Sequence, residues 1–148
     1  MDSQADLRDR AKRSLKVAEH MLTQTYPIVN DPKLILAISE DIYTALSSSM
    51  SAITLSEGDF HQDFADFKQR SSELGFKEDE IDLIERFHSI ITEHKESPVE
   101  FARKDKFVIC DEKYNFDSLS LDDMKSYLFR ARLFVEKAEA ILDSKENK

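Results

Sequence analysis

Residues 121–142, LDDMKSYLFRARLFVEKAEAIL, decide the fold of this chain. Apolar side chains recur there at alternating steps of three and four positions, at Leu121, Met124, Leu128, Ala131, Val135, Ala138 and Leu142. An α-helix places such positions on one face, and that face leaves water only by packing against partner helices. The stretch therefore predicts a long helix in a helical bundle.

The rest of the chain is typical of the same fold class. Sheet-rich folds need many turn residues, whereas this chain has 2 glycines and 3 prolines. Amphipathic patterns and capping residues predict further helices over residues 5–26, 31–55, 57–74 and 78–97. Pro27 is expected to end the first of these helices, and Gly75 to cap the third. Ser120 and Asp123 resemble a capping box at the start of the last helix.

The segment before the last helix is irregular. Residues 106–110, KFVIC, have strand character but no obvious pairing partner. We therefore expect a short helical turn near Val99–Arg103, followed by an extended loop that crosses the bundle. The resulting prediction is an all-α protein, an up-and-down bundle of four long helices with a short helix and an irregular crossing loop. It forms one domain over residues 1–148, frayed at 1–4 and 145–148.

The composition excludes several kinds of functional site. Phosphate-cradling loops need closely spaced glycines; GxxxxGK[ST], GxGxxG and GxSxG are all absent, and we predict no cofactor and no catalytic residue. Cys110 is the single cysteine, so an internal disulfide is excluded, and its apolar surroundings are typical of an inert buried thiol. Because the chain has no long apolar run and no apolar N-terminal signal region, we expect a cytosolic protein with no membrane partner.

Charge is distributed unevenly along the chain. The net charge is −9, and residues 31–100 carry 6 basic and 16 acidic side chains. This acidity disfavours non-specific binding of nucleic acid and is typical of a solvated surface.

Basic side chains nevertheless gather in the first helix, the irregular segment and the last helix. The candidate anion- or nucleic-acid-binding residues are Arg8, Arg10, Lys12, Arg13, Lys16, Arg103, Lys104, Arg130 and Arg132. If the first and last helices are neighbours, these residues form one positive surface that suits a phosphate ligand, RNA or an acidic partner. The alternative is ion pairing with the acidic middle helices of the same molecule.

Two helical pairs have the spacing of metal ligands. Glu85 and His88 are three positions apart, and Glu57 and His61 are four apart, so each pair shares a helix face. Di-iron bundles use two Glu-x-x-His motifs, whereas only one is present here. The alternatives are a solvated face for Glu57 and His61 and a core-edge position for His88.

Phe129 and Leu133 predict an interface. At about 100° per residue they point away from the main apolar stripe of the last helix. Two large apolar side chains on an outer face are expected to be covered by another part of the protein or by a partner. Either the loop that contains Phe107 and Ile109 or a second subunit could supply this cover.

The order of the predicted helices is similar to that of HEPN domains, small helical bundles found in prokaryotic toxin–antitoxin and RNA-processing systems. Residues 11–22, AKRSLKVAEHML, resemble the first helix of that family. Many members are ribonucleases with an Arg followed, after four to six residues, by a His on a late helix. Here no His follows Arg130 or Arg132, and only Arg13 and His20 have that spacing, on the first helix. The resemblance implies a member without nuclease activity; the chain also resembles archaeal helical bundles for which no activity is implied.

These observations favour a non-enzymatic protein-interaction module that self-associates as a homodimer or binds another protein. One alternative is a HEPN-like RNA- or nucleotide-binding protein without the nuclease motif. The other is a metal-dependent enzyme with a site between helices, built from Glu57, His61, Glu85 and His88.

Overall fold

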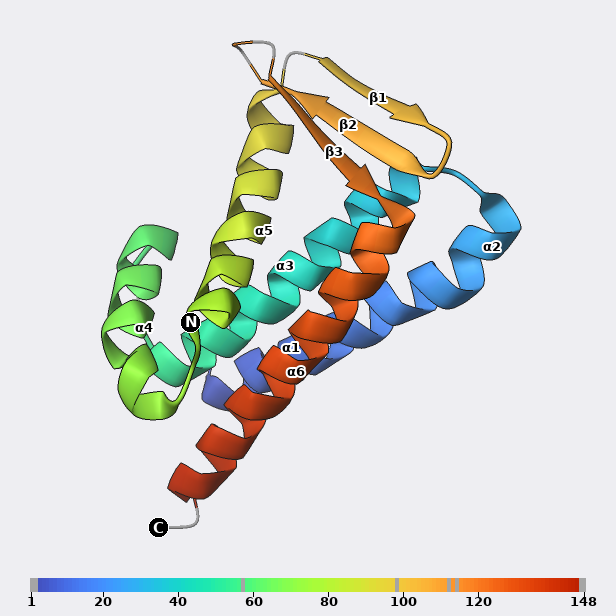
Figure 1. Ribbon diagram of the computed structural model, residues 1–148. Coiled ribbons are helices and arrows are strands. Elements are labelled where there is room, and N and C mark those ends of the chain that lie inside the picture. The colour runs from blue at the N-terminus through green and yellow to red at the C-terminus, as the bar shows by residue number, and fades with distance from the viewer. Residues whose placement is uncertain (1–2, 57, 98, 112, 114, 147–148) are drawn as a thin grey trace.

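The computed structural model describes residues 3–146 apart from 57, 98, 112 and 114. Its helices are α1 (Gln4–His20), α2 (Tyr26–Val29), α3 (Lys33–Thr54), α4 (Phe60–Leu74), α5 (Glu78–Glu96) and α6 (Leu121–Glu146). Its strands are β1 (Val99–Arg103), β2 (Lys106–Cys110) and β3 (Phe116–Ser120). The predicted helical class is confirmed in its main part, since the chain is mostly helical, but a small sheet makes the all-α description inexact (Figure 1).

Helix α3 forms the centre of the molecule, because it packs against α1, α5 and α6. Its apolar side chains, among them Ile35, Ile38 and Ile42, are fully buried. Small residues let α1 approach α3 closely: Ala11 and Ala18 on α1 and Ala45 on α3 are all buried. The long helix over residues 121–142 lies alongside α3 and α1, as the apolar repeat predicts (Figure 1).

The first helix does not end at Pro27. A π-helical turn, Met21–Thr25, follows α1, and α2 continues the helix to Val29. We call this continuous helical segment, residues 4–29, the rod. Proline lacks an N–H and its ring clashes with the carbonyl four residues earlier in an α-helix. In the wider turn the Tyr26 N–H bonds to the Met21 carbonyl, five residues back, which makes room for the ring. The rod ends instead at Asn30, whose backbone is left-handed with φ 53°.

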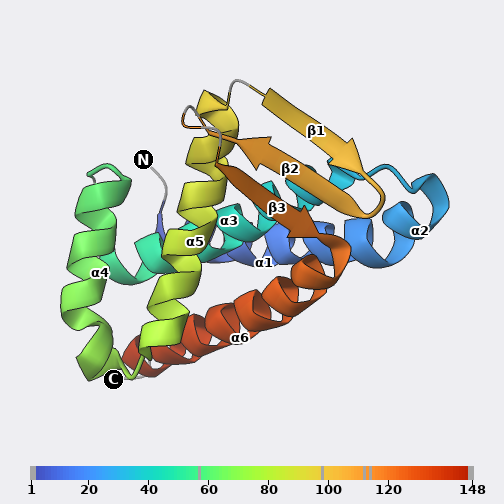
Figure 2. The same cartoon turned by 45° about the horizontal axis from the view of Figure 1, so that its top comes forward.

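The segment expected to be an irregular loop is an antiparallel sheet in the order β1-β2-β3. The helical turn expected at Val99–Arg103 is wrong, because these residues pair with Lys106–Cys110 as β1. Strand β2 is central and finds partners on both sides. The sheet lies across the end of the bundle at which α5 ends and α6 begins (Figure 2). Its inner face buries Phe107, Ile109 and Leu119 against the helices.

Local capping signals are confirmed where the sequence places them. Gly75 has φ 87° and caps α4. Ser120 and Asp123 exchange side-chain and backbone hydrogen bonds of 3.1 and 3.0 Å at the start of α6. Ser3 caps α1 in the same way with Asp6, so this helix begins at Gln4. None of the helices in the described residues is long and apolar enough to cross a membrane.

Candidate functional site

The outer face of the sheet carries the most distinctive surface of the molecule. Alternation along the strands places Phe101 and Arg103 of β1, Lys106 of β2 and Phe116 of β3 on this face. The side chains of Phe101 and Phe116 are 43% and 66% exposed, and their ring centroids are 6.4 Å apart in an edge-to-face pair. Lys104 is exposed at the adjoining hairpin turn. We call Phe101, Phe116, Arg103, Lys104 and Lys106 the sheet surface.

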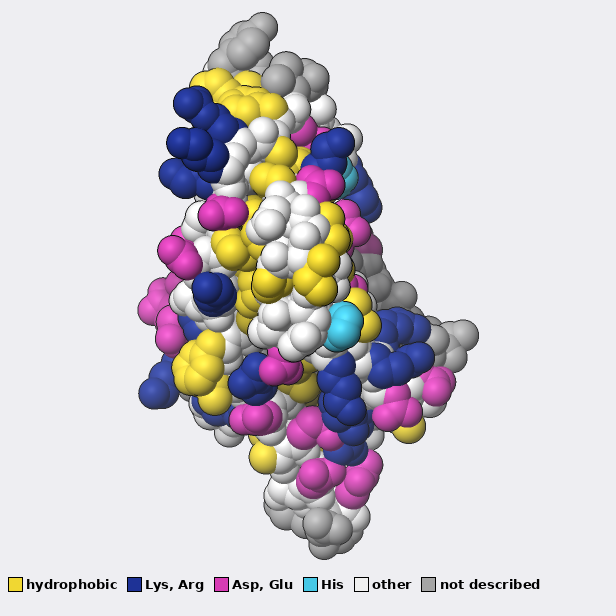
Figure 3. Space-filling model, turned by 90° about the vertical axis from the view of Figure 1, so that its right-hand side faces the viewer, with side chains coloured by type: hydrophobic (Ala, Val, Ile, Leu, Met, Phe, Trp, Pro, Cys, Tyr) yellow, Lys and Arg dark blue, Asp and Glu magenta, His cyan; other side chains and the backbone are white. Residues whose placement is uncertain are grey.

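Acidic side chains of the same strands face the other way or are engaged elsewhere. Glu100 lies 2.6 Å from the His94 ring nitrogen, and Asp105 accepts a 2.8 Å hydrogen bond from the Tyr26 hydroxyl. Asp117 binds Arg86 of α5. At the upper end of the molecule, where the sheet lies, Figure 3 shows hydrophobic and basic side chains next to each other. The sheet surface is therefore aromatic and cationic, although the chain as a whole is acidic.

Beneath the sheet, an ionic network joins α5, β3 and α6. The Arg86 guanidinium donates to both Asp117 oxygens at 2.6 and 2.8 Å and to the Tyr127 oxygen at 3.4 Å. These bonds from Arg86 lower the pKa of Asp117. Burial, together with a hydrogen bond to Asp117, raises the pKa of Glu93 to about 7. Glu93 and Asp117 thus form a carboxylic acid–carboxylate pair near neutral pH.

A hollow of about 350 Å³ opens beside this network, lined by Glu93, Glu96, Asp111, Lys113 and Asn115. A carboxyl group that titrates near pH 7 can exchange a proton with a ligand. However, Asp117 is engaged by Arg86, and Asp111 accepts hydrogen bonds from the Lys113 and Asn115 backbone within its own turn. The arrangement therefore fits a structural network that fastens the sheet to α5.

Replacing Glu93 by glutamine tests this network. Because the pKa of Glu93 is about 7 in the fold against an ordinary 4.5, its protonation stabilises the fold fully below about pH 4.5. That stabilisation is lost as the pH rises through 7. Glutamine keeps the neutral form, so Glu93→Gln is expected to match wild type at pH 5 and exceed it at pH 8. The gain is about 1 kcal/mol after screening by water.

Urea unfolding at both pH values measures the effect. Glu96→Gln is the matched control, because Glu96 lines the same hollow but is exposed. Equal stability of Glu93→Gln and wild type at pH 8 would show that the fold does not raise the pKa of Glu93.

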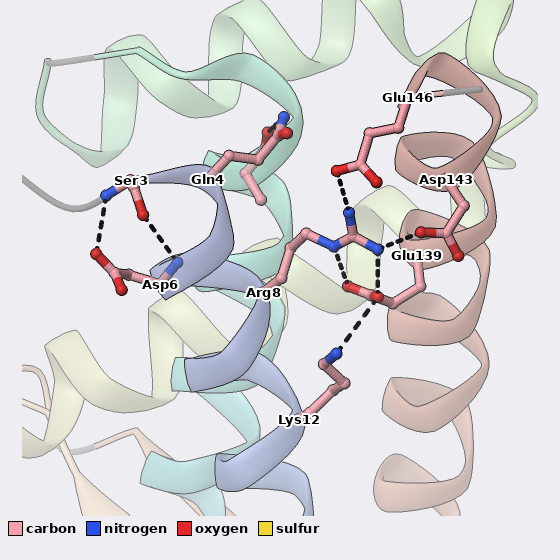
Figure 4. A network of polar contacts seen from close by, with 9 residues as sticks. Ser3, Gln4, Asp6, Arg8, Lys12, Glu139, Asp143 and Glu146 are labelled. Atoms are coloured by element: carbon pink, nitrogen blue, oxygen red, sulfur yellow. Dashed lines mark hydrogen bonds and ion pairs between the residues drawn. The ribbon is translucent and has the colours of Figure 1, made fainter. Parts of the chain in front are cut away.

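Part of the predicted basic surface between the first and last helices is occupied by ion pairs. Arg8, 13% exposed at its side chain, binds both oxygens of Glu139 at 2.9 and 2.7 Å and also contacts Asp143 and Glu146 (Figure 4). Lys12 lies 3.6 Å from the same Glu139. The two helices are neighbours, and Arg8 and Lys12 pair with acidic side chains of α6 rather than with those of the middle helices.

The remaining basic candidates lie in several places, and those that line the groove between α1 and α6, Lys16 and Arg132, share it with Glu19, Glu136, Glu139 and Asp143. Arg132 pairs with Glu19 at 3.4 Å, and Arg130 donates to the Asp79 carbonyl at 3.3 Å. Arg103 and Lys104 lie at the hairpin, on the sheet surface. Of the other three, Arg10 is half-buried and makes a contact within the molecule, whereas Arg13 and Lys16 are exposed. The latter two border a shallow hollow with Asp9 and Lys12. The nine residues do not form one continuous positive surface.

The predicted metal ligands are brought together only in part. The His61 and His88 rings lie 5.6 Å apart, and Phe60 stacks on His88 at 3.8 Å. Burial, aided by His61, lowers the pKa of His88 against the opposing charge of Glu85. Glu57 lies outside the described residues. Within residues that the structure describes, no three His, Cys, Asp or Glu side chains could hold one metal ion.

The outer stripe of α6 is exposed. Phe129 and Leu133 are 57% and 48% exposed, whereas Phe107 and Ile109, expected on the covering loop, are 6% and 1% exposed. That expectation is wrong, because β2 turns both side chains inward as the central strand. Beside Leu133 a hollow of about 360 Å³ is lined by Lys77, Asp79, Glu80, Leu83, Arg130 and Lys137.

Sequence reasoning missed the aromatic part of the sheet surface and the network of Arg86, Glu93 and Asp117. Lys106 and Phe107 belong to a run with recognised strand character, which was the available signal for a sheet. No protein-family model matches the chain, and a search of curated proteins finds no match. The resemblance to HEPN domains therefore remains a prediction.

Proposed function

We propose that this protein is a non-enzymatic interaction module that self-associates through the outer stripe of α6. The observation that carries the proposal is the exposure of Phe129 and Leu133 next to a hollow. Positions four apart share a helix face, so the two side chains form one apolar patch. Burying such a patch removes apolar area from water, which favours association.

A second copy of the chain fits this patch by symmetry. In an antiparallel two-fold pairing of α6 with its copy, Phe129 lies opposite Leu133 of the second chain, and the reverse contact forms at the same time. The hollow beside Leu133 has Leu83 in its lining and can receive a phenyl ring. The same register places exposed Lys125 opposite Lys137 of the copy, whose charge Glu80 of its own chain neutralises at 2.7 Å, and one position away from exposed Glu136. Shape and charge thus both favour self-pairing.

Sedimentation equilibrium of the full chain tests the proposal. Because the patch is small, we expect a weak dimer whose dissociation constant lies between about 10 μM and 1 mM. Phe129→Ser combined with Leu133→Ser is expected to give a monomer throughout this range. Phe116→Ser is the matched control, since it removes an even more exposed ring from another surface and should leave the dimer intact.

Charge variants test the register. Lys125→Glu alone places two acidic side chains together and is expected to weaken the dimer about threefold or more. Adding Glu136→Lys restores opposite charges and should restore association. A strictly monomeric wild type at roughly 1 mM, or a dimer insensitive to the Phe129 and Leu133 changes, contradicts the proposal.

A further inference from the structure

We infer that the sheet surface binds single-stranded nucleic acid. Unpaired bases stack on Phe116 and Phe101, and the phosphates lie against Arg103, Lys104 and Lys106. This inference uses a different face of the molecule from the α6 stripe and is independent of self-association.

The two aromatic rings form a platform for bases. Phe116 is the most exposed aromatic side chain on the sheet at 66%, and Phe101 supports it edge-on at 6.4 Å. Both project from a hydrogen-bonded sheet whose inner face is fixed in the core by Phe107 and Leu119, so the rings are held in place before a ligand arrives. Stacking on a phenyl face tolerates any base, because every base has a π-face.

The three cations lie where we expect the phosphate backbone of a bound single strand to pass when its bases stack on the rings. Arg103 is two residues from Phe101 on the same face of β1, and Lys106 of β2 is the cross-strand partner of Arg103. In the part of the chain that the structure describes, none of Arg103, Lys104 and Lys106 forms an ion pair. Among the acids of the segment, Glu100, Asp105 and Asp117 contact His94, Tyr26 and Arg86 instead, and Asp111 accepts hydrogen bonds within its own turn. On the outer face of the three strands, both charged side chains, Arg103 and Lys106, are therefore basic.

Lys104 has a backbone conformation that a lysine rarely adopts. Its φ of 35° lies in the left-handed region that glycine or asparagine adopts more easily. The hairpin turn therefore carries a cation at a position where glycine would form the turn with less strain. Lys104→Gly removes the charge while suiting the backbone, which makes it a clean test variant.

Single strands fit this surface better than the other polyanions. In a duplex the base faces are hidden in the stack, so the rings would have nothing to bind and only the phosphates would contribute. An acidic peptide would likewise use the cations but not the rings. The acidic residues in 31–100 lie mainly on other elements, and salt near 0.1 M screens them beyond about 10 Å.

Fluorescence anisotropy with a labelled oligouridine of about 12 nucleotides tests the inference on the full chain. With three phosphates neutralised and a slope of about −0.7 per phosphate, the affinity should fall roughly twentyfold between 50 and 200 mM salt. A DNA duplex of the same length is expected to bind at least about tenfold more weakly.

Variants separate stacking from charge. Phe116→Ala and Phe101→Ala are each expected to lower the affinity at least about fivefold without changing the salt slope. Lys106→Gln and Lys104→Gly should each reduce the slope by about 0.7. Phe129→Ala and Lys16→Gln remove an exposed ring and an exposed cation elsewhere and are expected to change nothing. Circular dichroism confirms that each variant is folded.

Three results would overturn the inference. The first is no binding of oligouridine at 50 mM salt. The second is binding that Phe116→Ala and Phe101→Ala leave unchanged. The third is equal competition by the duplex or by an oligoglutamate of matched length, which would show that charge alone is recognised. The Phe129→Ser, Leu133→Ser variant should still bind oligouridine, so this inference and the proposed self-association can fail separately.

Discussion

Replacing Phe134 by alanine is expected to lower the free energy of unfolding by about 3–5 kcal/mol. Phe134 is fully buried on α6, and its ring centroid lies 5.9 Å from that of Phe67 and 5.1 Å from that of Phe76. Phe67 belongs to α4, and Phe76 follows the Gly75 cap. The three rings thus fasten the α4 end of the molecule to α6, and deleting one leaves a cavity that the other two cannot fill.

Urea unfolding measures this loss. Phe134→Leu is the first control, since it keeps most of the volume and should cost less than about 1.5 kcal/mol. Phe129→Ala is the second control, because it deletes an exposed ring from the same helix and should change stability by no more than about 0.5 kcal/mol. A loss below about 1 kcal/mol for Phe134→Ala would mean that this ring is not enclosed as described.

Replacing Arg86 by methionine is expected to cost about 2–3 kcal/mol at pH 8. Methionine preserves the apolar stem of the side chain but leaves Asp117 and Glu93 facing each other without a cation. Breaking a fully buried ion pair costs about 3–5 kcal/mol, and the figure is smaller here because the side chains of Arg86 and Asp117 are 32% and 21% exposed. At pH 5 the carboxyl pair can take up a proton, so the loss should be smaller there.

A double-mutant cycle isolates the Arg86–Asp117 contribution. In an Asp117→Leu background, Arg86→Met removes no ion pair and should cost less than about 1 kcal/mol. Chemical denaturation of the four proteins at pH 5 and pH 8 gives the coupling. Equal costs of Arg86→Met in both backgrounds would show that Arg86 acts through packing alone.

The features predicted correctly are those that neighbouring residues decide. Gly75 caps α4 because a left-handed residue is needed there, and Ser120 with Asp123 forms the start of α6 through bonds spanning three positions. Pro27 shows the limit of a local rule, since proline is compatible with a helix once a π-turn relieves its clash. Whether that turn forms depends on the packing of the rod against α3, which no local pattern encodes.

The features missed depend on residues far apart in the chain. Strands β1 and β3 are short, and Val99–Arg103 becomes a strand only because β2 lies beside it. The partner of a basic candidate can also lie far along the chain: Arg8 binds Glu139, 131 positions away. The pKa of Glu93 likewise depends on Asp117, which β3 brings to α5.

By itself, the order of amino acids determined that amphipathic helices would form and pack, since helical periodicity needs only residues three and four positions apart. It also identified Phe129 and Leu133 as outward-facing on the last helix, by the same periodicity. Only the tertiary structure decided that Phe101 and Phe116 share a face with Arg103 and Lys106, and that Arg8, Lys12 and Arg132 of the predicted basic cluster are ion-paired. Such groupings depend on strand register and on the distance between elements, which are set by the global packing of the core.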